Sequence, residues 1–310
     1  MLRTPVASGQ FYPSSARALR ELITSFIDKS SPPAGESSAS LSSPPTGEPS
    51  TFTSSPLRGE DKGEGVKLKA IGIVVPHAGY VCSGVVAGAV YSRLSIPELV
   101  IILGPNHTGL GPAFSLMAEG AYQTPLGEVP ISSLTKDLLE QSSLLEPDES
   151  AHQSEHSLEV QVPFLQFCAE NVARGFSLAN KFAIIPIVVG SLQQTNLLKL
   201  GQEIAGFIKN SNAETLIIAS SDMTHYEPDQ MAREKDKYAL EAVLALDPEM
   251  LLSRTAERNI SMCGVGPTAI MLSAARELNA TKAELVMYNT SGDTCGDRDS
   301  VVGYAGVIIT

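Results

Sequence analysis

Residues 70–77 read AIGIVVPH, residues 99–107 read LVIILGPNH and residues 215–225 read TLIIASSDMTH. Each segment begins with a short apolar run rich in β-branched residues, over 70–75, 99–103 and 215–219, and each ends a few residues later on a histidine. Runs of this length without strict alternation are typical of strands that are buried on both faces of a sheet. In an open α/β sheet, ligands bind beyond the carboxyl ends of the strands. We therefore expect the three histidines to meet in one crevice.

Apolar runs alternate with helical patterns along the rest of the chain. Further apolar runs cover 182–189, 285–288 and 301–309, and helical patterns cover 16–27, 83–94, 135–141, 156–169, 192–208, 230–245, 248–258 and 266–278. This alternation predicts an α/β fold, with helices on both faces of a largely parallel or mixed central sheet. The last two apolar runs lie close together and predict an antiparallel hairpin at one edge of that sheet.

Residues 30–65 differ from the rest of the chain. Their 36 positions hold ten Ser, six Pro and five Gly, and a 12-residue unit occurs three times, starting with SSPPAGE, SSPPTGE and SSPLRGE. A segment with so few large apolar side chains buries too little surface to offset its chain entropy. We predict a disordered insertion within a single domain that spans residues 1–310. A proline-rich ligand for a partner domain is the alternative interpretation.

The chain carries 34 acidic and 22 basic residues, for a formal net charge of −12. This surplus of negative charge repels phosphate backbones and anionic lipids, so we expect neither a nucleic-acid partner nor a membrane partner. No apolar run approaches the ~20 residues that a bilayer-spanning helix needs. The first ten residues lack the continuous apolar core of a signal peptide. These features predict a soluble cytoplasmic protein.

The four cysteines are far apart and form no CxxC pair, so their pattern does not resemble a disulfide framework. Cys82 and Cys168 are interpreted as packing residues, and the role of Cys295 is open. Cys263 stands directly before the helical pattern 266–278. The amide groups and dipole at a helix N-terminus favour a thiolate, which is a metal ligand or a nucleophile. The alternative for Cys263 is a small buried residue.

The remaining histidines lie close together in the segment AHQSEHSLE, residues 151–159. His156 and Glu159 are three positions apart and would share one helix face. Two interpretations are open. Either His156 lines the crevice and Glu159 orients it, or both side chains lie on the surface. We expect His152 on the surface.

Seven ordered motifs resemble those of the Memo family, whose bacterial members include the AmmeMemoRadiSam system protein B. They are RTPVA with GQFYP (3–13), VPHAGY with SG (75–84), GPNH (104–107), EHSLE with PFL (155–165), SSDMTHY (220–226), CG (263–264) and VVGY (301–304). The resemblance implies functional association with an AMMECR1-type protein and a radical-SAM protein, and an unknown small-molecule substrate.

The fold of this family resembles the catalytic subunits of class III extradiol dioxygenases, which open catechol rings with a non-haem Fe(II). The resemblance implies that His77 and His107 are the two histidine ligands of a metal. Cys263 stands where the dioxygenases have a glutamate. The resemblance makes Fe(II) the expected metal. A thiolate in that place favours Fe, Cu(I) or Zn, so Cu and Zn are alternatives.

The same resemblance places His225 at the acid–base position, with Asp222 orienting it. Tyr80, Tyr226 and His156 are then expected to line the substrate pocket. The leading interpretation is a metal-dependent oxidoreductase. Two alternatives are a metal-free enzyme with Cys263 as nucleophile and His225 as base, and a non-catalytic module that binds phosphopeptides or small molecules in the same crevice.

Overall fold

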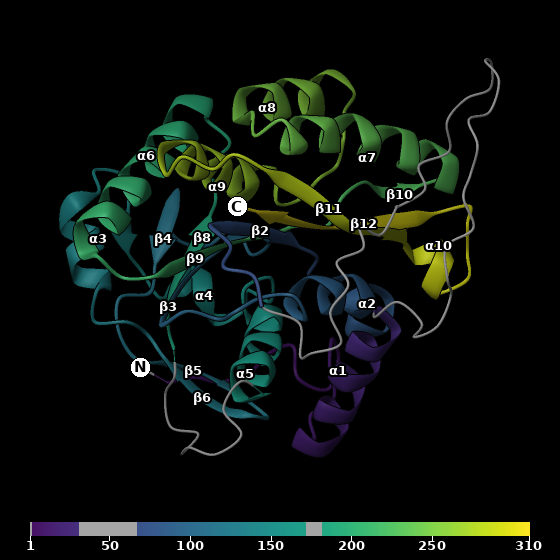
Figure 1. Cartoon of the computed structure of the whole chain (residues 1–310), viewed down its shortest axis with the longest axis horizontal. Helices are drawn as coiled ribbons and strands as arrows, with labels where there is room; N and C mark the ends of the chain where they lie inside the picture. The colour runs from purple at the N-terminus through teal and green to yellow at the C-terminus, as the bar shows by residue number, and fades with distance from the viewer. Residues whose placement is uncertain (1, 31–66, 172–181) are drawn as a thin grey trace.

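The computed structural model describes residues 2–30, 67–171 and 182–310. Within these residues the main feature is a mixed nine-stranded sheet (Figure 1). Its centre consists of parallel strands in the spatial order β2 (Gly72–Val75), β9 (Thr215–Ser220), β3 (Leu99–Pro105) and β8 (Ala183–Val189). The predicted apolar runs are therefore the central strands, as expected.

The edges of the sheet are antiparallel or short. They are β12 (Val301–Ile309), antiparallel to β2; β11 (Ala283–Thr290) and β10 (His225–Glu227), both antiparallel to β12; β4 (Phe114–Leu116), antiparallel to β8; and β7 (Glu146–Pro147). The predicted hairpin at one edge is confirmed by the pairing of β11 with β12.

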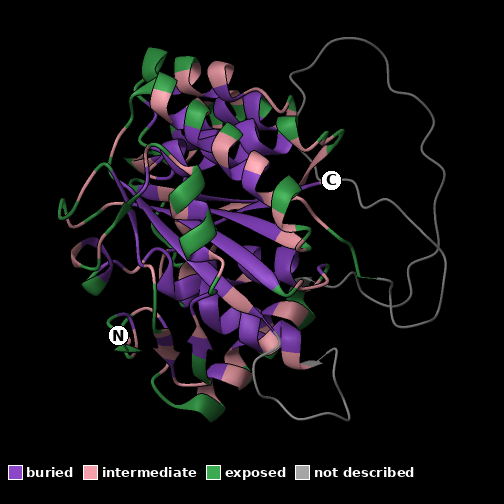
Figure 2. Ribbon diagram, turned by 90° about the vertical axis from the view of Figure 1, so that its left-hand side faces the viewer, coloured by how far each residue is buried: buried purple, intermediate pink, exposed green. Residues whose placement is uncertain are grey.

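Helices cover both faces of the sheet, as Figure 1 shows. On one face lie α3 (Thr135–Gln141), α6 (Gln194–Ser211), α7 (Asp229–Leu244), α8 (Pro248–Glu257) and α9 (Val265–Glu277); on the other lie α1 (Ala16–Ser30), α2 (Tyr80–Tyr91) and α5 (Val162–Asn171). Strand β3 contributes side chains to the core on both faces of the sheet. Ile101 packs on the face covered by α6 and α9, and Ile102 packs on the face covered by α1, α2 and α5. The central strands β2, β9, β3 and β8 are buried along almost their whole length (Figure 2). The predicted α/β fold is confirmed.

A small second sheet holds the N-terminal segment against the middle of the chain. It contains β1 (Leu2–Arg3), β5 (Ala121–Thr124) and β6 (Gly127–Pro130), with β1 parallel to β5. The short helices α4 (Ser150–Gln153) and α10 (Ser291–Thr294) complete the fold. The predicted helix 156–169 begins later than expected, because a single 3-10 turn (Glu159–Gln161) precedes α5.

The predicted 30–65 insertion lies outside the described residues, apart from Ser30 at the end of α1. Among the helices of the described residues, none is long and apolar enough to cross a membrane.

The cysteine prediction needs one correction. Cys82 and Cys295 form a disulfide across 213 positions, with their Cα atoms 6.0 Å apart. Wide spacing in sequence concealed this pair, because the fold brings the first turn of α2 against the end of α10. Cys168 is buried in the core, as predicted, and Cys263 is a free, partly buried thiol.

Candidate metal centre

The strand order brings the strand-end histidines together. His77 follows β2 and His107 follows β3, and these two strands flank β9 on either side. Because the strands are parallel, both loops emerge at the same edge of the sheet. The two imidazole rings meet edge to face with their centroids 5.2 Å apart. The third segment, Asp222 to His225, leaves β9 between them.

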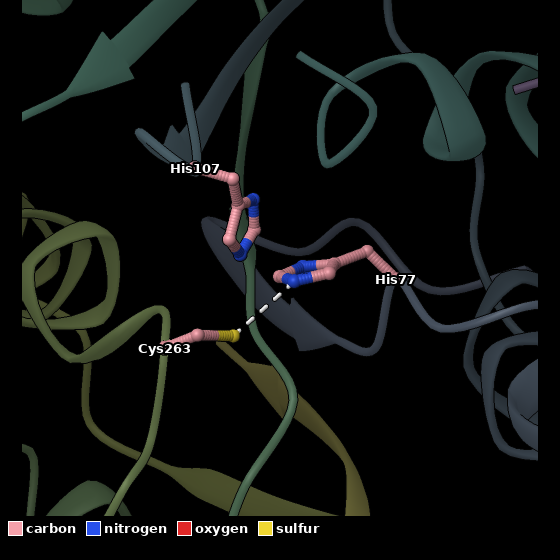
Figure 3. A group of neighbouring side chains, drawn as sticks. All are labelled: His77, His107 and Cys263. Carbon is pink, nitrogen blue, oxygen red and sulfur yellow. Dashed lines mark hydrogen bonds between the residues drawn. The ribbon is translucent and has the colours of Figure 1, made fainter. Parts of the chain in front are cut away.

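Cys263 joins this group from the loop before α9 (Figure 3). The loop lies tightly against the end of β9, since a Cβ on Gly264 would sit 2.4 Å from the Ser220 carbonyl oxygen. The sulfur lies 3.2 Å from Nε2 of His77. One ligand atom from each of His77, His107 and Cys263 falls within 4.8 Å of the others. The predicted residues therefore converge on one point.

Hydrogen bonds determine which nitrogen of His77 carries the proton. Ser220 Oγ donates to the Ser157 carbonyl at 2.7 Å and accepts from Gln161 Nε2 at 2.8 Å. The Ser220 hydroxyl therefore already donates its one proton. In the 3.0 Å contact with His77 Nδ1, Ser220 Oγ must then accept from Nδ1–H. The lone pair of Nε2 then faces Cys263. Neutral imidazole with a free Nε2 is the form that binds metal.

His107 is oriented by a buried carboxylate. Its Nδ1 lies 2.8 Å from Glu155 Oε1, and its backbone N–H donates to Glu155 Oε2 at 2.6 Å. An ionised carboxylate only accepts, so Nδ1 carries the proton and Nε2 is free. His156 stacks on His107, with ring centroids 4.7 Å apart, and its Nδ1 lies 3.5 Å from the same carboxylate oxygen.

Sequence reasoning missed the residues that orient these two rings. Glu155 immediately precedes His156, so the EHSLE motif contained the signal, but the acid was sought at Glu159 instead. Ser220 and Gln161 carry no local signal, because a serine at a strand end and a glutamine before a helix are ordinary residues. Their roles depend on contacts across more than 50 positions.

Burial shifts the pKa values of two candidate ligands, His77 and Cys263, toward their neutral forms. Burial lowers the pKa of His77 to about 4, although Asp222 acts in the opposite direction. Burial and then the charge of Asp222 raise the pKa of the Cys263 thiol well above its usual range. The expectation that the helix start makes Cys263 a thiolate is thus wrong for the protein without a cation. A bound cation supplies the positive charge that the thiolate needs.

The donor set fits a metal ion such as the dioxygenase resemblance implies. Two imidazole nitrogens and one thiolate sulfur are ligands that Zn, Fe and Cu accept. Ligand atoms around a tetrahedral ion lie roughly 3.4–3.6 Å apart, from metal–ligand distances of about 2.0–2.3 Å. The observed limit of 4.8 Å needs only small side-chain movements to reach that spacing. A backbone N–H of Asp222 also donates to the sulfur at 3.3 Å, which favours its anionic form.

The candidate ligands open into a cavity of about 490 Å³. Its walls include Phe11, His156, His225, Tyr226 and Val302. Tyr226 is 79% exposed at the mouth, and its backbone lies in the left-handed region, which non-glycine residues rarely adopt. A strained residue of this kind is common at ligand sites.

His225 lies in the cavity wall but is not oriented by Asp222. Its Nδ1–H donates to the Ser261 carbonyl at 2.9 Å, which leaves Nε2 as an acceptor. The Asp222 carboxylate accepts instead from the backbone N–H groups of His77 and Ala78. The predicted pairing is therefore wrong, since the acid holds the His77 loop in place.

Two further expectations about the site are corrected. Tyr80 does not line the cavity; it is buried, and its hydroxyl donates to the Val160 carbonyl at 2.6 Å. Glu159 orients the N-terminal segment rather than His156, because its carboxylate binds Arg3 and accepts from the backbone N–H groups of Val6 and Ala7.

His152 is buried and not on the surface as expected. Its Nε2 lies 3.2 Å from the Ser115 carbonyl and its Nδ1 lies 3.0 Å from the Tyr122 hydroxyl. These contacts suit a neutral ring in which Nε2 donates and Nδ1 accepts. Burial lowers the pKa of His152 to about 4. This histidine therefore stabilises the fold, away from the cavity.

Comparison with known proteins identifies the family. The model of the family described as "Memo-like protein" matches residues 3–308. The chain belongs to the Memo family. Among its relatives, a MEMO1 family protein of Methanopyrus kandleri is 36% identical, with 99% of each chain covered. One of Ignicoccus hospitalis is 39% identical, over 99% of this chain and 98% of its own length. One of Aquifex aeolicus is 43% identical, over 78% of this chain and 86% of its own length.

A solved structure supports the fold of this Memo-family chain. The crystal structure of an uncharacterized protein from Escherichia coli K12 aligns with a TM-score of 0.51 at 13% identity. It covers 76% of this chain and 98% of the other. At so low an identity, the alignment bears on the fold alone, and the site rests on the geometry of this chain's own residues.

Proposed function

We propose that this Memo-family chain is a metal-dependent oxidoreductase whose metal is held by His77, His107 and Cys263. The observation that carries the proposal is the convergence of two free imidazole nitrogens and one sulfur within 4.8 Å. Each ring has a hydrogen-bond partner on its other nitrogen, as metal-binding histidines normally do. Three protein ligands leave coordination positions open toward the cavity.

The remaining residues of the cavity have separate tasks in this proposal. A metal with open positions supplies a binding point for substrate and a centre for redox chemistry. His225 accepts a proton from the substrate at Nε2, because its Nδ1–H is held by Ser261. Phe11 and Tyr226 provide aromatic walls, and His156 provides a second polar ring beside His107. The substrate is accordingly a small polar molecule with an ionisable hydroxyl or amine.

Fe(II) is the metal we propose first. Two histidines, one anionic ligand and open positions are the arrangement that non-haem iron uses, with the thiolate here in place of a carboxylate. Zinc would give a closed-shell site that activates water instead. The thiolate sulfur would favour copper in its reduced state, Cu(I). Anaerobic purification followed by elemental analysis distinguishes the three metals.

The decisive experiment compares metal content after purification without added metal. We expect about one metal per chain in the wild type and almost none in the H77A/H107A double variant or in C263S. His225→Gln and Cys168→Ser are the matched controls, because one removes a cavity imidazole and the other a thiol outside the ligand set. Equal metal content in wild type and double variant would contradict the proposal.

A metal-free cysteine enzyme is the second candidate, and one contact favours it. Cys263 lies 3.2 Å from His77 Nε2, so its base would be His77 and not His225 as first expected. The raised pKa of the thiol opposes this chemistry, because the nucleophile must be a thiolate. Rapid alkylation of Cys263 at neutral pH in chelator-treated protein, slowed by H77A, would support it over the metal site.

A further inference from the structure

The disulfide between Cys82 and Cys295 joins two walls of the cavity. Cys82 lies in the first turn of α2, and its backbone N–H donates to the Gly79 carbonyl at 2.9 Å. Gly79 itself lines the cavity, two residues after His77. A change in the position of Cys82 is therefore transmitted directly to the loop that follows β2.

The other half of the disulfide is connected to the opposite wall. Cys295 ends α10, and its backbone N–H donates to the carbonyl of Ser291. The hydroxyl of Ser291 accepts from Val302 N–H at 3.0 Å. Val302 lines the cavity and pairs with His225 across β12 and β10. Figure 1 shows α10 beside α2, at the end of the β11–β12 hairpin.

The segment around Cys295 keeps its own internal support. Asp293 accepts from Arg233 at 2.6 Å and from Arg298 at 2.8 Å, and Asp229 accepts from both arginines. These ion pairs join α10 to α7, not to α2. Breaking the disulfide thus removes the covalent link between α10 and α2, whereas the ion pairs to α7 do not depend on it.

A thiol can reach this disulfide from solution. Cys295 is exposed, and no atom lies within 4 Å of the Cβ position of the neighbouring Gly296. The surroundings are acidic, because the four carboxylates of Asp229, Asp293, Asp297 and Asp299 outnumber the two guanidinium groups of Arg233 and Arg298. An anionic thiol is therefore repelled, and a cationic thiol is attracted.

We propose that Cys82–Cys295 is a reversible thiol–disulfide site that couples the redox state of the medium to the cavity walls, with neutral or cationic thiols as its reductants. A thiolate attacks the sulfur of Cys295, the exposed residue of the pair, which forms a mixed disulfide and releases Cys82 as a thiol after protonation. A second thiolate attacks the sulfur of the bound reductant. Cys295 leaves and is protonated, and the two reductant molecules depart as a disulfide. Two electrons and two protons enter the protein.

The first test maps the bond in the full chain. Protein purified in air is alkylated with iodoacetamide under denaturing conditions, digested without reductant and analysed by mass spectrometry. We expect a linked pair of peptides containing Cys82 and Cys295, with Cys168 and Cys263 alkylated. Alkylation of both Cys82 and Cys295 in this sample would overturn the proposal.

The second test measures reduction and its effect on the cavity walls. Each thiol's rate is divided by its rate with a small neutral disulfide at the same thiolate concentration, because thiolates differ in nucleophilicity. On this scale and at low salt, cysteamine should reduce the bond several-fold faster than 3-mercaptopropionate, and added salt should lessen the difference. Equal rates would overturn the selection by charge. Hydrogen exchange at residues 78–82 and 291–302 should rise on reduction, and unchanged exchange would overturn the coupling.

Matched variants separate this site from other effects of the reductant. C82S/C295S should show the high exchange of the reduced protein with or without thiol, whereas C168S should respond as the wild type does. No readout involves a metal, so a failure here is distinct from a failure of the proposed metal site. Because the wild type is itself measured with and without reductant, poor folding of the double variant leaves the test intact.

Discussion

The two candidate histidine ligands are oriented by different chemistry. His77 donates to a neutral hydroxyl, that of Ser220, whereas His107 donates to the carboxylate of Glu155. The carboxylate makes its ring the more electron-rich donor. Burial, the largest influence, lowers the pKa of His107, but the hydrogen bond and charge of Glu155 together raise it above its usual value. The Nε2 atoms of His77 and His107 therefore differ in basicity in the protein without a bound cation.

Removing the hydroxyl partner of His77 tests the role of that hydrogen bond. We expect Ser220→Ala to weaken metal affinity by about 10–100-fold, because the ring loses its orientation and two N–H groups lose their acceptor. Competition with a chromogenic chelator measures the affinity. Ser273→Ala is the control, since that buried hydroxyl donates only to the distant Leu198 carbonyl. Equal affinities for the two variants would argue against the assignment.

His152 makes stability depend on pH. Its pKa is about 4 in the folded protein and near 6.5 in the unfolded chain, so below pH 6.5 the unfolded chain binds the extra proton. Stability contributed by the neutral ring is complete above pH 6.5 and is lost as the pH falls toward 4. The loss approaches roughly 3 kcal/mol. Urea unfolding at several pH values should show a shallower pH dependence for His152→Gln than for wild type.

At the scale of elements, the site depends on the close approach of α9 to the end of β9. A Cβ on Gly264 would lie 2.3 Å from the Ser221 Cβ and 2.4 Å from the Ser220 carbonyl oxygen. Only glycine allows this contact, which brings the neighbouring Cys263 to the histidines. The backbone of Gly264 has a negative φ, so space and not conformation requires the glycine.

Gly264→Ala should therefore separate α9 from the sheet end. We expect a loss of about 1–3 kcal/mol in the free energy of unfolding and weaker metal binding, because overpacking moves the backbone. Gly206→Ala in α6 is the control, since nothing lies within 4 Å of its Cβ position. That change should be neutral or stabilising by up to about 1 kcal/mol. Denaturant unfolding and chelator competition measure the two effects.

The N-terminal segment is held by a buried ion pair. Arg3 and Glu159 have side chains that are 3% and 0% exposed. Arg3→Ala leaves the carboxylate charge buried without its partner, so we expect a loss of about 3–5 kcal/mol. Arg93→Ala breaks an exposed pair with Glu284 and should cost no more than about 1 kcal/mol. Similar losses for both variants in urea unfolding would contradict this interpretation.

At the scale of the whole molecule, apolar patterns predicted the fold well. Strand β12 and helix α3 have the predicted bounds, and the other main elements differ by a few residues. Strand order was not readable, because the apolar runs resemble one another and pairing is decided by packing. The short strands β4 to β7 were missed, since two to four residues carry no periodicity.

Sequence reasoning named His77, His107 and Cys263, which converge at the candidate site, but it did not name the residues that orient them. Histidines at strand ends and a cysteine before a helix stand out in the sequence, because few other residue types bind metals or act as nucleophiles. The roles of Glu155 and Ser220 and the partner of Cys82 cannot be read from the sequence, since each depends on which loops become neighbours. The family resemblance led us to expect Tyr80 in the pocket, but its ring packs inward against Phe164.

His77 and Cys263 are 186 positions apart, and the packing of the α9 N-terminus against the sheet brings them into contact. An unfolded chain has no comparable cluster of donors, so a cation bound by this trio would have little affinity for the denatured ensemble. Ion uptake would then follow completion of the sheet during synthesis. On heating, the ion would be released as the chain unfolds. A metal-sensitive dye and circular dichroism, recorded together, should therefore give the same midpoint temperature.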